Sequence, residues 1–209
     1  MNLQLALDRL DWDTCFQVVE DTEEAIDYIE IGTGVIKEYG MAIVREMRKR
    51  YPDKVIVADM KICDAGKHEA KQAFEAGADI TTVMAFASPI TIQDTMEVAR
   101  ECDKQVMVDL LGVTSQEQIR ELNEINVMSV GLHIGKDQQQ KNTFHHDLFS
   151  LVKGYDFNVT VAGGINLETL PQIVERRPDT VIVGSAITKA EKPKRAAQEM
   201  KHIMKEKTE

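Results

Sequence analysis

The sequence predicts an α/β fold, a single (β/α)8 barrel (TIM barrel) that spans residues 1–209 as one catalytic domain. Three observations predict it: short apolar segments recur along the chain, a helical pattern lies in each gap between them, and successive segments begin about 20 to 30 residues apart. An open, doubly wound parallel sheet is the alternative. No Gly-x-Gly-x-x-Gly motif follows any of the segments, which disfavours a dinucleotide-binding fold.

The apolar segments are expected to be strands of a parallel sheet that is buried on both faces. Each is about four to six residues long and mostly apolar throughout, whereas a half-exposed strand would alternate with polar residues. The expected strands are Leu3–Leu7, Tyr28–Ile31, Lys54–Ala58, Ile80–Met84, Gln105–Leu110, Val127–Leu132, Asn158–Ala162 and Thr180–Val183.

Helix boundary signals fall in the gaps between these segments. Ser88-Pro89 is typical of an N-cap followed by proline at the first helical position. Residues 114–117, Thr-Ser-Gln-Glu, indicate a capping box. Gly77 stands where a left-handed glycine can end a helix, and Asn166 can cap a further helix.

Composition indicates a cytoplasmic protein without nucleic-acid or membrane partners. The 25 Lys and Arg against 35 Asp and Glu give a net charge of −10, which disfavours an anionic polymer or surface as partner. No stretch approaches the roughly 18 apolar residues of a membrane helix, and the first residues do not resemble a signal peptide. The three cysteines, Cys15, Cys63 and Cys102, are widely spaced, which favours reduced thiols over disulfides or zinc.

Polar residues lie at the carboxyl ends of most expected strands. In a (β/α)8 barrel these ends meet at one mouth, where catalytic residues lie. Any one such residue alone could be a cap or a solvated loop residue, but their shared position favours one active site. The residues are Asp8, Glu30, Asp59, Lys61, Asp64, Asp109 and His133.

The third strand end has the clearest chemistry. Asp59 and Lys61 are two residues apart, so their side chains are expected to point the same way. Carboxylates beside Lys61 favour its ammonium form, a fixed cation that can stabilise developing negative charge. Glu30 and Asp59 can supply two oxygen ligands to Mg²⁺, although both could instead simply pair with Lys61. His133 is a candidate acid or base, with a core histidine as the alternative.

Two glycine turns follow the last two expected strands and are candidate phosphate sites. Gly163-Gly164 is expected to open a helix after the seventh strand, and Gly184-Ser185 follows the eighth. Glycine lets backbone N–H groups approach an anion, and a helix N-terminus favours negative charge. Phosphate binding by the loops after strands seven and eight recurs in this barrel, while tight turns without a ligand are the alternative.

Several motifs together resemble the 3-hexulose-6-phosphate synthases. Their sister family is the 3-keto-L-gulonate-6-phosphate decarboxylases, and the more distant orotidine-5′-phosphate decarboxylases share the D-x-K-x-x-D pattern. The resemblance runs essentially end to end. The motifs are LQLALD, IEIGTGVIK, ADMKICDAG, VDLLGV, GLHIGKDQQ, VAGGINLETLP and VIVGSAIT.

The resemblance implies a lyase that joins formaldehyde and D-ribulose 5-phosphate into D-arabino-3-hexulose 6-phosphate, and the reverse, through an enediolate. Mg²⁺ would be held by Glu30 and Asp59, and Lys61 would contact the enediolate oxygens. His133 would move protons at the reacting carbon. Asp64 would reach into the site of a partner subunit, so the enzyme would be a homodimer.

The resemblance also implies the residues that bind the substrate. Asp8 would contact the sugar hydroxyls, and Asp109 and Lys136 are further candidates for contacts with the sugar. The phosphate would be held by the two glycine turns, through Gly163, Gly164, Gly184 and Ser185.

Three alternatives stay open at this point. A 3-keto-L-gulonate-6-phosphate decarboxylase would use the same enediolate; Asp109 and Gly184-Ser185 favour the synthase, whereas Lys136 stands where the decarboxylases have arginine. A ribulose-phosphate 3-epimerase needs metal-binding histidines where this sequence has Glu30 and Asp59. A non-catalytic phosphosugar-binding protein would not require an acid, a base and a cation together.

Overall fold

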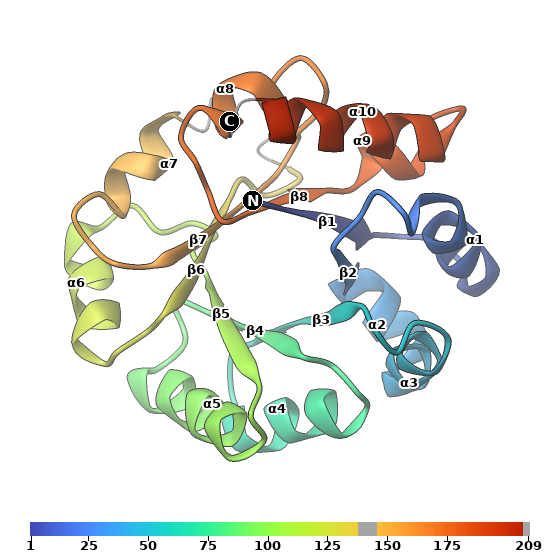
Figure 1. The fold of residues 1–209 in the computed structure, drawn as a ribbon. Helices are drawn as coiled ribbons and strands as arrows, with labels where there is room; N and C mark the ends of the chain where they lie inside the picture. Colours follow the sequence, from blue (N-terminus) through green and yellow to red (C-terminus); the bar gives the residue numbers. More distant parts are fainter. Residues whose placement is uncertain (138–145, 207–209) are drawn as a thin grey trace.

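The computed structural model describes residues 1–137 and 146–206. Its parallel strands close into a barrel in the order β1 to β8, and the helices form a ring outside them (Figure 1). This confirms the predicted (β/α)8 barrel and rules out the open sheet. That all of residues 1–209 form one domain stays a prediction, and so does any role of the two glutamines of GLHIGKDQQ, which lie outside the described residues.

The predicted strands are all present, and four of them keep their predicted bounds. β1 pairs with β2 and with β8, which closes the barrel. The strands are β1 (Asn2–Leu7), β2 (Tyr28–Ile31), β3 (Val55–Ile62), β4 (Ile80–Met84), β5 (Gln105–Asp109), β6 (Ser129–His133), β7 (Asn158–Ala162) and β8 (Thr180–Val183).

β3 runs four residues beyond its predicted end at Ala58. Ala58 pairs with Thr81 but Ile62 pairs with Val83, so four steps along β3 match two along β4, and the strand contains a bulge. Lys61 lies in this bulge with φ of 50°. The prediction stopped early because the bulge residues are polar; they belong to the strand itself.

The helices fill the gaps as predicted. The predicted cap at Ser88 accepts a hydrogen bond from the first turn of its helix, and Gly77 follows the end of its helix with φ of 104°. The helix predicted after residues 114–117 is present, but its N-cap is Ser115 rather than Thr114, the residue that a capping box with Glu117 requires. The helices are α1 (Trp12–Thr22), α2 (Thr33–Tyr39), α3 (Met41–Arg50), α4 (Gly66–Glu75), α5 (Pro89–Glu101), α6 (Gln116–Glu124), α7 (His146–Leu151), α8 (Leu170–Val174), α9 (Ser185–Thr188) and α10 (Pro193–Glu206). Across the two described segments, none of them has both the length and the apolar character needed to cross a membrane.

One helix prediction was wrong. Gly163-Gly164 does not open a helix, because α8 begins only at Leu170. Asn166 caps the turn before it instead: its Oδ1 accepts the backbone N–H of Glu168 at 2.9 Å and of Thr169 at 3.0 Å.

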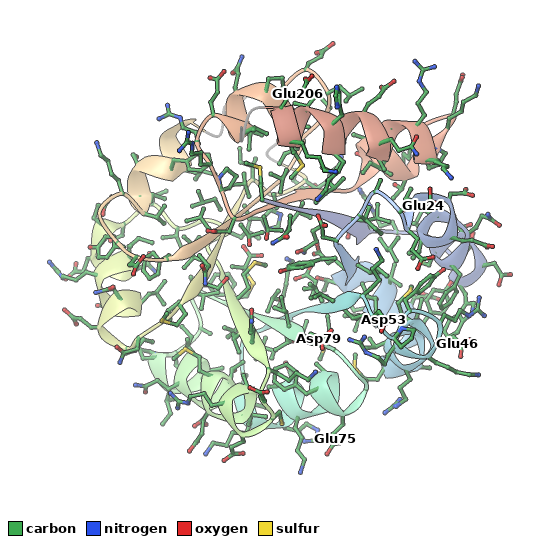
Figure 2. All side chains as sticks on the ribbon, viewed as in Figure 1. Glu24, Glu46, Asp53, Glu75, Asp79 and Glu206 are labelled. Atoms are coloured by element: carbon green, nitrogen blue, oxygen red, sulfur yellow. The ribbon has the colours of Figure 1, made fainter. Side chains whose placement is uncertain are left out.

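Carboxylates fix the amino-terminal end of the barrel. Asp27, Asp79 and Asp179 directly precede β2, β4 and β8, and each accepts the backbone N–H of the second residue of the preceding strand, at 2.7, 2.9 and 2.7 Å. Asp79, labelled in Figure 2, also pairs with Arg48 and with Lys104. These bonds set the register of neighbouring strands where the barrel begins.

The barrel interior has two cavities with a thin apolar layer between them. Ala6, Met107 and Ile182 pack together inside the barrel, apart from the large core between strands and helices. Below them, a cavity of about 270 Å³ is lined mainly by polar residues, among them Gln4 and Thr160. Above them, a cavity of about 660 Å³ opens at the carboxyl ends of the strands.

Candidate active site

The upper cavity collects all but one of the predicted site residues. Its walls come from β1 to β3, from β5 to β8 and from the loops that follow them. Asp64 is the residue that it lacks. The predicted residues that line it are Asp8, Glu30, Asp59, Lys61, Asp109, His133, Lys136, Gly163, Gly164, Gly184 and Ser185.

Lys61 is held between two carboxylates. Its Nζ lies 3.1 Å from Asp59 Oδ2 and 2.9 Å from Asp109 Oδ2. Burial alone would lower the pKa of Lys61, but the charges of Asp59 and Asp109 and their hydrogen bonds raise it above its ordinary value. Lys61 is therefore a fixed ammonium, as predicted, and its charge faces the cavity.

Asp109 connects Lys61 to His133. Its Oδ2 lies 2.9 Å from Nδ1 of His133, and its Oδ1 accepts the backbone N–H of Leu111 at 2.9 Å. Burial would raise the pKa of Asp109, yet the hydrogen bond and charge of His133, and then Lys61, lower it to about 2. Because Nδ1 of His133 faces this carboxylate, Nε2 is the ring nitrogen left for a substrate.

Asp59 is oriented by two threonines that the sequence did not reveal as site residues. Thr33 Oγ1 donates to Asp59 Oδ2 at 2.8 Å, and Thr82 Oγ1 donates to Asp59 Oδ1 at 2.8 Å. Thr82 also accepts the backbone N–H of Lys61 at 2.9 Å, so it stabilises the bulge. A threonine inside a strand is ordinary, and only the register of β3 against β4 shows its role.

Glu30 and Asp8 have fewer positively charged partners than Asp59 and Asp109, which both pair with Lys61. Glu30 is buried and accepts Gln4 Nε2 at 2.7 Å, while Lys61 pairs with Asp59 and Asp109. Burial, and then the charge of Asp59, raise the pKa of Glu30 well above its ordinary value; the same two causes raise that of Asp8. The expectation that Glu30 might simply pair with Lys61 is therefore not met.

Asp64 lies outside the cavity of its own chain. It is exposed, and its Oδ1 accepts the backbone N–H of the next residue, Ala65, at 2.8 Å. Its predicted role in a partner's site stays a prediction.

The two glycine turns line the cavity in different ways. Gly184 is the N-cap of α9, which begins at Ser185, so this turn places a helix start at the cavity as in other barrels of this class. Gly163 has φ of 108°, and a Cβ there would lie 2.3 Å from the carbonyl oxygen of Ile134. Only glycine fits at this position, because the two backbones approach closely.

Cations other than Lys61 also line the cavity. Arg9 follows Asp8 at the end of β1, and Lys189 follows α9; with Lys136 they bring positive side chains to a cavity that also contains several carboxylates. The sequence predicted only helix starts as a local attraction for anions. For Arg9 the available signal was its position directly after Asp8, whereas Lys189 lies one short helix beyond Ser185 and had no such signal.

Comparison with known proteins places the chain in a family. A 3-hexulose-6-phosphate synthase of Bacillus subtilis (strain 168) is 36% identical over 207 residues, which cover 98% of this chain and 99% of the relative. The structure of 3-hexulose-6-phosphate synthase from Salmonella typhimurium has a TM-score of 0.96 at 34% identity, over 99% of this chain and 100% of that one.

A second group of structures is similar but less identical. The structure of KGPDC (3-keto-L-gulonate-6-phosphate decarboxylase) from Streptococcus mutans has a TM-score of 0.87 at 27% identity, over 100% of this chain and 99% of that one. The resemblance that the motifs predicted is thus confirmed. Residues 1–200 match the family model described as orotidine 5′-phosphate decarboxylase / HUMPS family, and the chain therefore belongs to that family.

Proposed function

We propose that this chain catalyses the aldol condensation of formaldehyde with D-ribulose 5-phosphate to D-arabino-3-hexulose 6-phosphate, and its reverse. The observation that carries the proposal is the row formed by Lys61, Asp109 and His133, which sets an ammonium and an imidazole on the same buried carboxylate. The names of relatives support it, since proteins that are 34% to 36% identical to this chain are 3-hexulose-6-phosphate synthases.

The row supplies the two groups that the reaction needs. A base must remove a proton from C1 of ribulose 5-phosphate; the electron pair then moves onto the C2 oxygen and gives an enediolate. Nε2 of His133 is the available base, because Asp109 occupies Nδ1. Lys61 places positive charge where the enediolate forms. C1 then attacks the carbon of formaldehyde, and the formaldehyde oxygen takes up a proton as the new hydroxyl.

Mg²⁺ fits the remaining carboxylates. Glu30 and Asp59 would hold it: burial, and then the charge of Asp59, raise the pKa of Glu30, and a bound cation would relieve the repulsion between the two carboxylates. When bound, the ion would supply positive charge to the substrate's oxygens. Within residues 1–137 and 146–206 there is no group of three or more acidic, histidine or cysteine ligands, so water and substrate would complete the coordination.

The other end of the substrate would lie against the glycine turns. Gly163, Gly164, Gly184 and Ser185 line the cavity beside Lys189, and the start of α9 favours a phosphate there. Asp8 remains the candidate for the sugar hydroxyls.

Free thiols at the three cysteines support a cytoplasmic location.

Decarboxylation of 3-keto-L-gulonate 6-phosphate is the second candidate, because Lys136 lines the cavity where a substrate carboxylate could bind. A paired assay with Mg²⁺ distinguishes the two. We expect formaldehyde to be consumed only when ribulose 5-phosphate is present, without release of CO2 from the keto acid. CO2 release without formaldehyde consumption would favour the decarboxylase. Substrate binding without turnover in either assay would indicate a binding protein.

A homodimer is supported by the surface next to Asp64. The starts of α4 and α5 pack closely, since a Cβ at Gly66 would lie 2.4 Å from the carbonyl oxygen of Thr91. Asp64 lies just before α4, while Phe86 and Ile90, beside the start of α5, are 59% and 67% exposed. Large exposed apolar side chains beside a functional carboxylate are typical of an interface.

Mixing two inactive variants tests whether Asp64 acts across the interface. In a dimer of Lys61→Ala with Asp64→Ala, one of the two sites contains both intact residues, so random mixing should restore about a quarter of the activity. A mixture of Lys61→Ala with His133→Ala should stay inactive, because both residues belong to the same chain's site. No recovery in the first mixture would remove Asp64 from the partner's site.

A further inference from the structure

Gln4 lies inside the barrel one layer below Glu30. In the pairing of β1 with β2, Gln4 is opposite Tyr28 and Ala6 is opposite Glu30. Side chains at alternate positions of β1 face the interior, and Gln4 lines the lower cavity, although it is only 3% exposed. The methyl group of Ala6 leaves space beside Glu30, so the longer side chain of Gln4 can extend upward past the apolar layer.

The amide of Gln4 contacts Glu30 directly. Gln4 Nε2 donates to Glu30 Oε2 at 2.7 Å. Among the described residues, no other side chain hydrogen-bonds to this carboxylate. Asp59, by contrast, receives hydrogen bonds from Thr33, Thr82 and Lys61. The orientation of Glu30 therefore depends on one donor, which enters from the opposite side of the apolar layer.

We propose that Gln4 is a positioning residue that holds Oε2 of Glu30 and so presents the other oxygen, Oε1, to a divalent cation. This inference rests on the proposed function, in which Glu30 and Asp59 hold Mg²⁺. Residues that hydrogen-bond to metal ligands fix the ligand's orientation, and their loss typically weakens metal binding by about 10- to 100-fold. Gln4 reaches neither the substrate's side of the cavity nor the lining around Lys61.

The neutral amide suits this position. A lysine at residue 4 would bring its own charge to Glu30 and compete with the cation for it. A glutamate would place a second carboxylate against Glu30 inside the barrel, where repulsion is strong. Glutamine donates a hydrogen bond without altering the charge, so the carboxylate keeps its negative charge for the metal.

Calorimetric titration with Mg²⁺ tests the role of Gln4. The variants are Gln4→Met, which keeps the length of the side chain but removes the donor, and Gln4→Leu, which removes the donor with a shorter, branched side chain; neither adds charge beside Glu30. We expect Mg²⁺ binding to weaken by about 10- to 100-fold in both. The control is Thr160→Val, which changes another polar residue of the lower cavity and should leave the affinity unchanged.

A second measurement separates positioning from general damage. Melting temperatures in EDTA identify variants that fold, and Gln4→Leu serves if Gln4→Met does not fold. With saturating Mg²⁺, a folded variant should regain activity with an unchanged KM for ribulose 5-phosphate. Equal Mg²⁺ affinities of the unaltered protein and a folded variant would overturn the role of Gln4 alone. Failure of the unaltered protein to bind Mg²⁺ would overturn the metal assignment and this inference with it.

Discussion

Replacing Asp109 by asparagine should destabilise the protein in a pH-dependent manner. Asp109 is 2% exposed and lies between Lys61 and His133, which lower its pKa from 3.8 to about 2. A difference of about 1.8 units at about 1.4 kcal/mol per unit corresponds to about 2 kcal/mol of stability from the ionised carboxylate. The asparagine variant keeps the shape but lacks this contribution.

The pH at which the contribution disappears follows from the direction of the shift. Because the folded pKa is depressed, the stabilisation is complete above the unfolded pKa of 3.8 and is lost as the pH falls through about 2. The unaltered protein should therefore exceed Asp109→Asn by about 2 kcal/mol at pH 7 and pH 5, and by about half of that at pH 3.

Urea unfolding at these three pH values, followed by circular dichroism, measures the difference. Asp53→Asn is the matched control, because Asp53, labelled in Figure 2, is exposed; the substitution should change the free energy of unfolding by less than about 0.5 kcal/mol. A difference between Asp109→Asn and the unaltered protein that is the same at pH 7 and pH 3 would refute the reasoning, since it would not depend on ionisation of the carboxylate.

Two further substitutions test how the barrel is held together, both by urea unfolding at pH 7. Asp79→Ala removes the acceptor for a strand N–H and two cations, and should cost about 1–3 kcal/mol; a loss no larger than that of Asp53→Ala would contradict the role of Asp79. Gly163→Ala should cost more than Gly154→Ala. Both glycines have positive φ, and an alanine in that conformation costs about 1–3 kcal/mol of stability at either position. Only at Gly163 would the added Cβ also collide with a backbone oxygen, that of Ile134. Equal losses would show that the close approach does not matter.

The sequence predicted the barrel because its strands are buried on both faces and its helix signals lie between them. Strands β2, β4, β7 and β8 were predicted to the residue; Asp27, Asp79 and Asp179 directly precede three of them, and Gly32, Gly163 and Gly184 directly follow three of them. β3 was predicted too short because a bulge after Ala58 brings polar residues into the strand. A run of apolar residues cannot show a bulge, because a bulge depends on how the strand pairs with its neighbour.

The site was predicted in its charged residues but not in their connections. Charged residues at strand ends are visible in a sequence, and the cavity contains all of those predicted except Asp64. The roles of Thr82 and Gln4 were missed because each contact depends on the register of a strand against its neighbour. The helix after Gly163 was wrongly predicted, since a glycine pair indicates a turn but does not show how far the loop continues.

The carboxylates at the two ends of the barrel differ in how many hydrogen-bond donors and positive charges of the chain offset their negative charge. At the amino-terminal end, Asp79 receives a backbone N–H and two cations, and these partners keep its pKa below its ordinary value despite burial. At the opposite end, burial and neighbouring carboxylates raise the pKa of Glu30 and of Asp8. A cation that bound at that end would therefore stabilise the folded state. Glu30 and Asp8 both line the upper cavity, whereas the bonds of Asp27, Asp79 and Asp179 that set the strand register lie at the other end of the barrel, so the two tasks are separated in space.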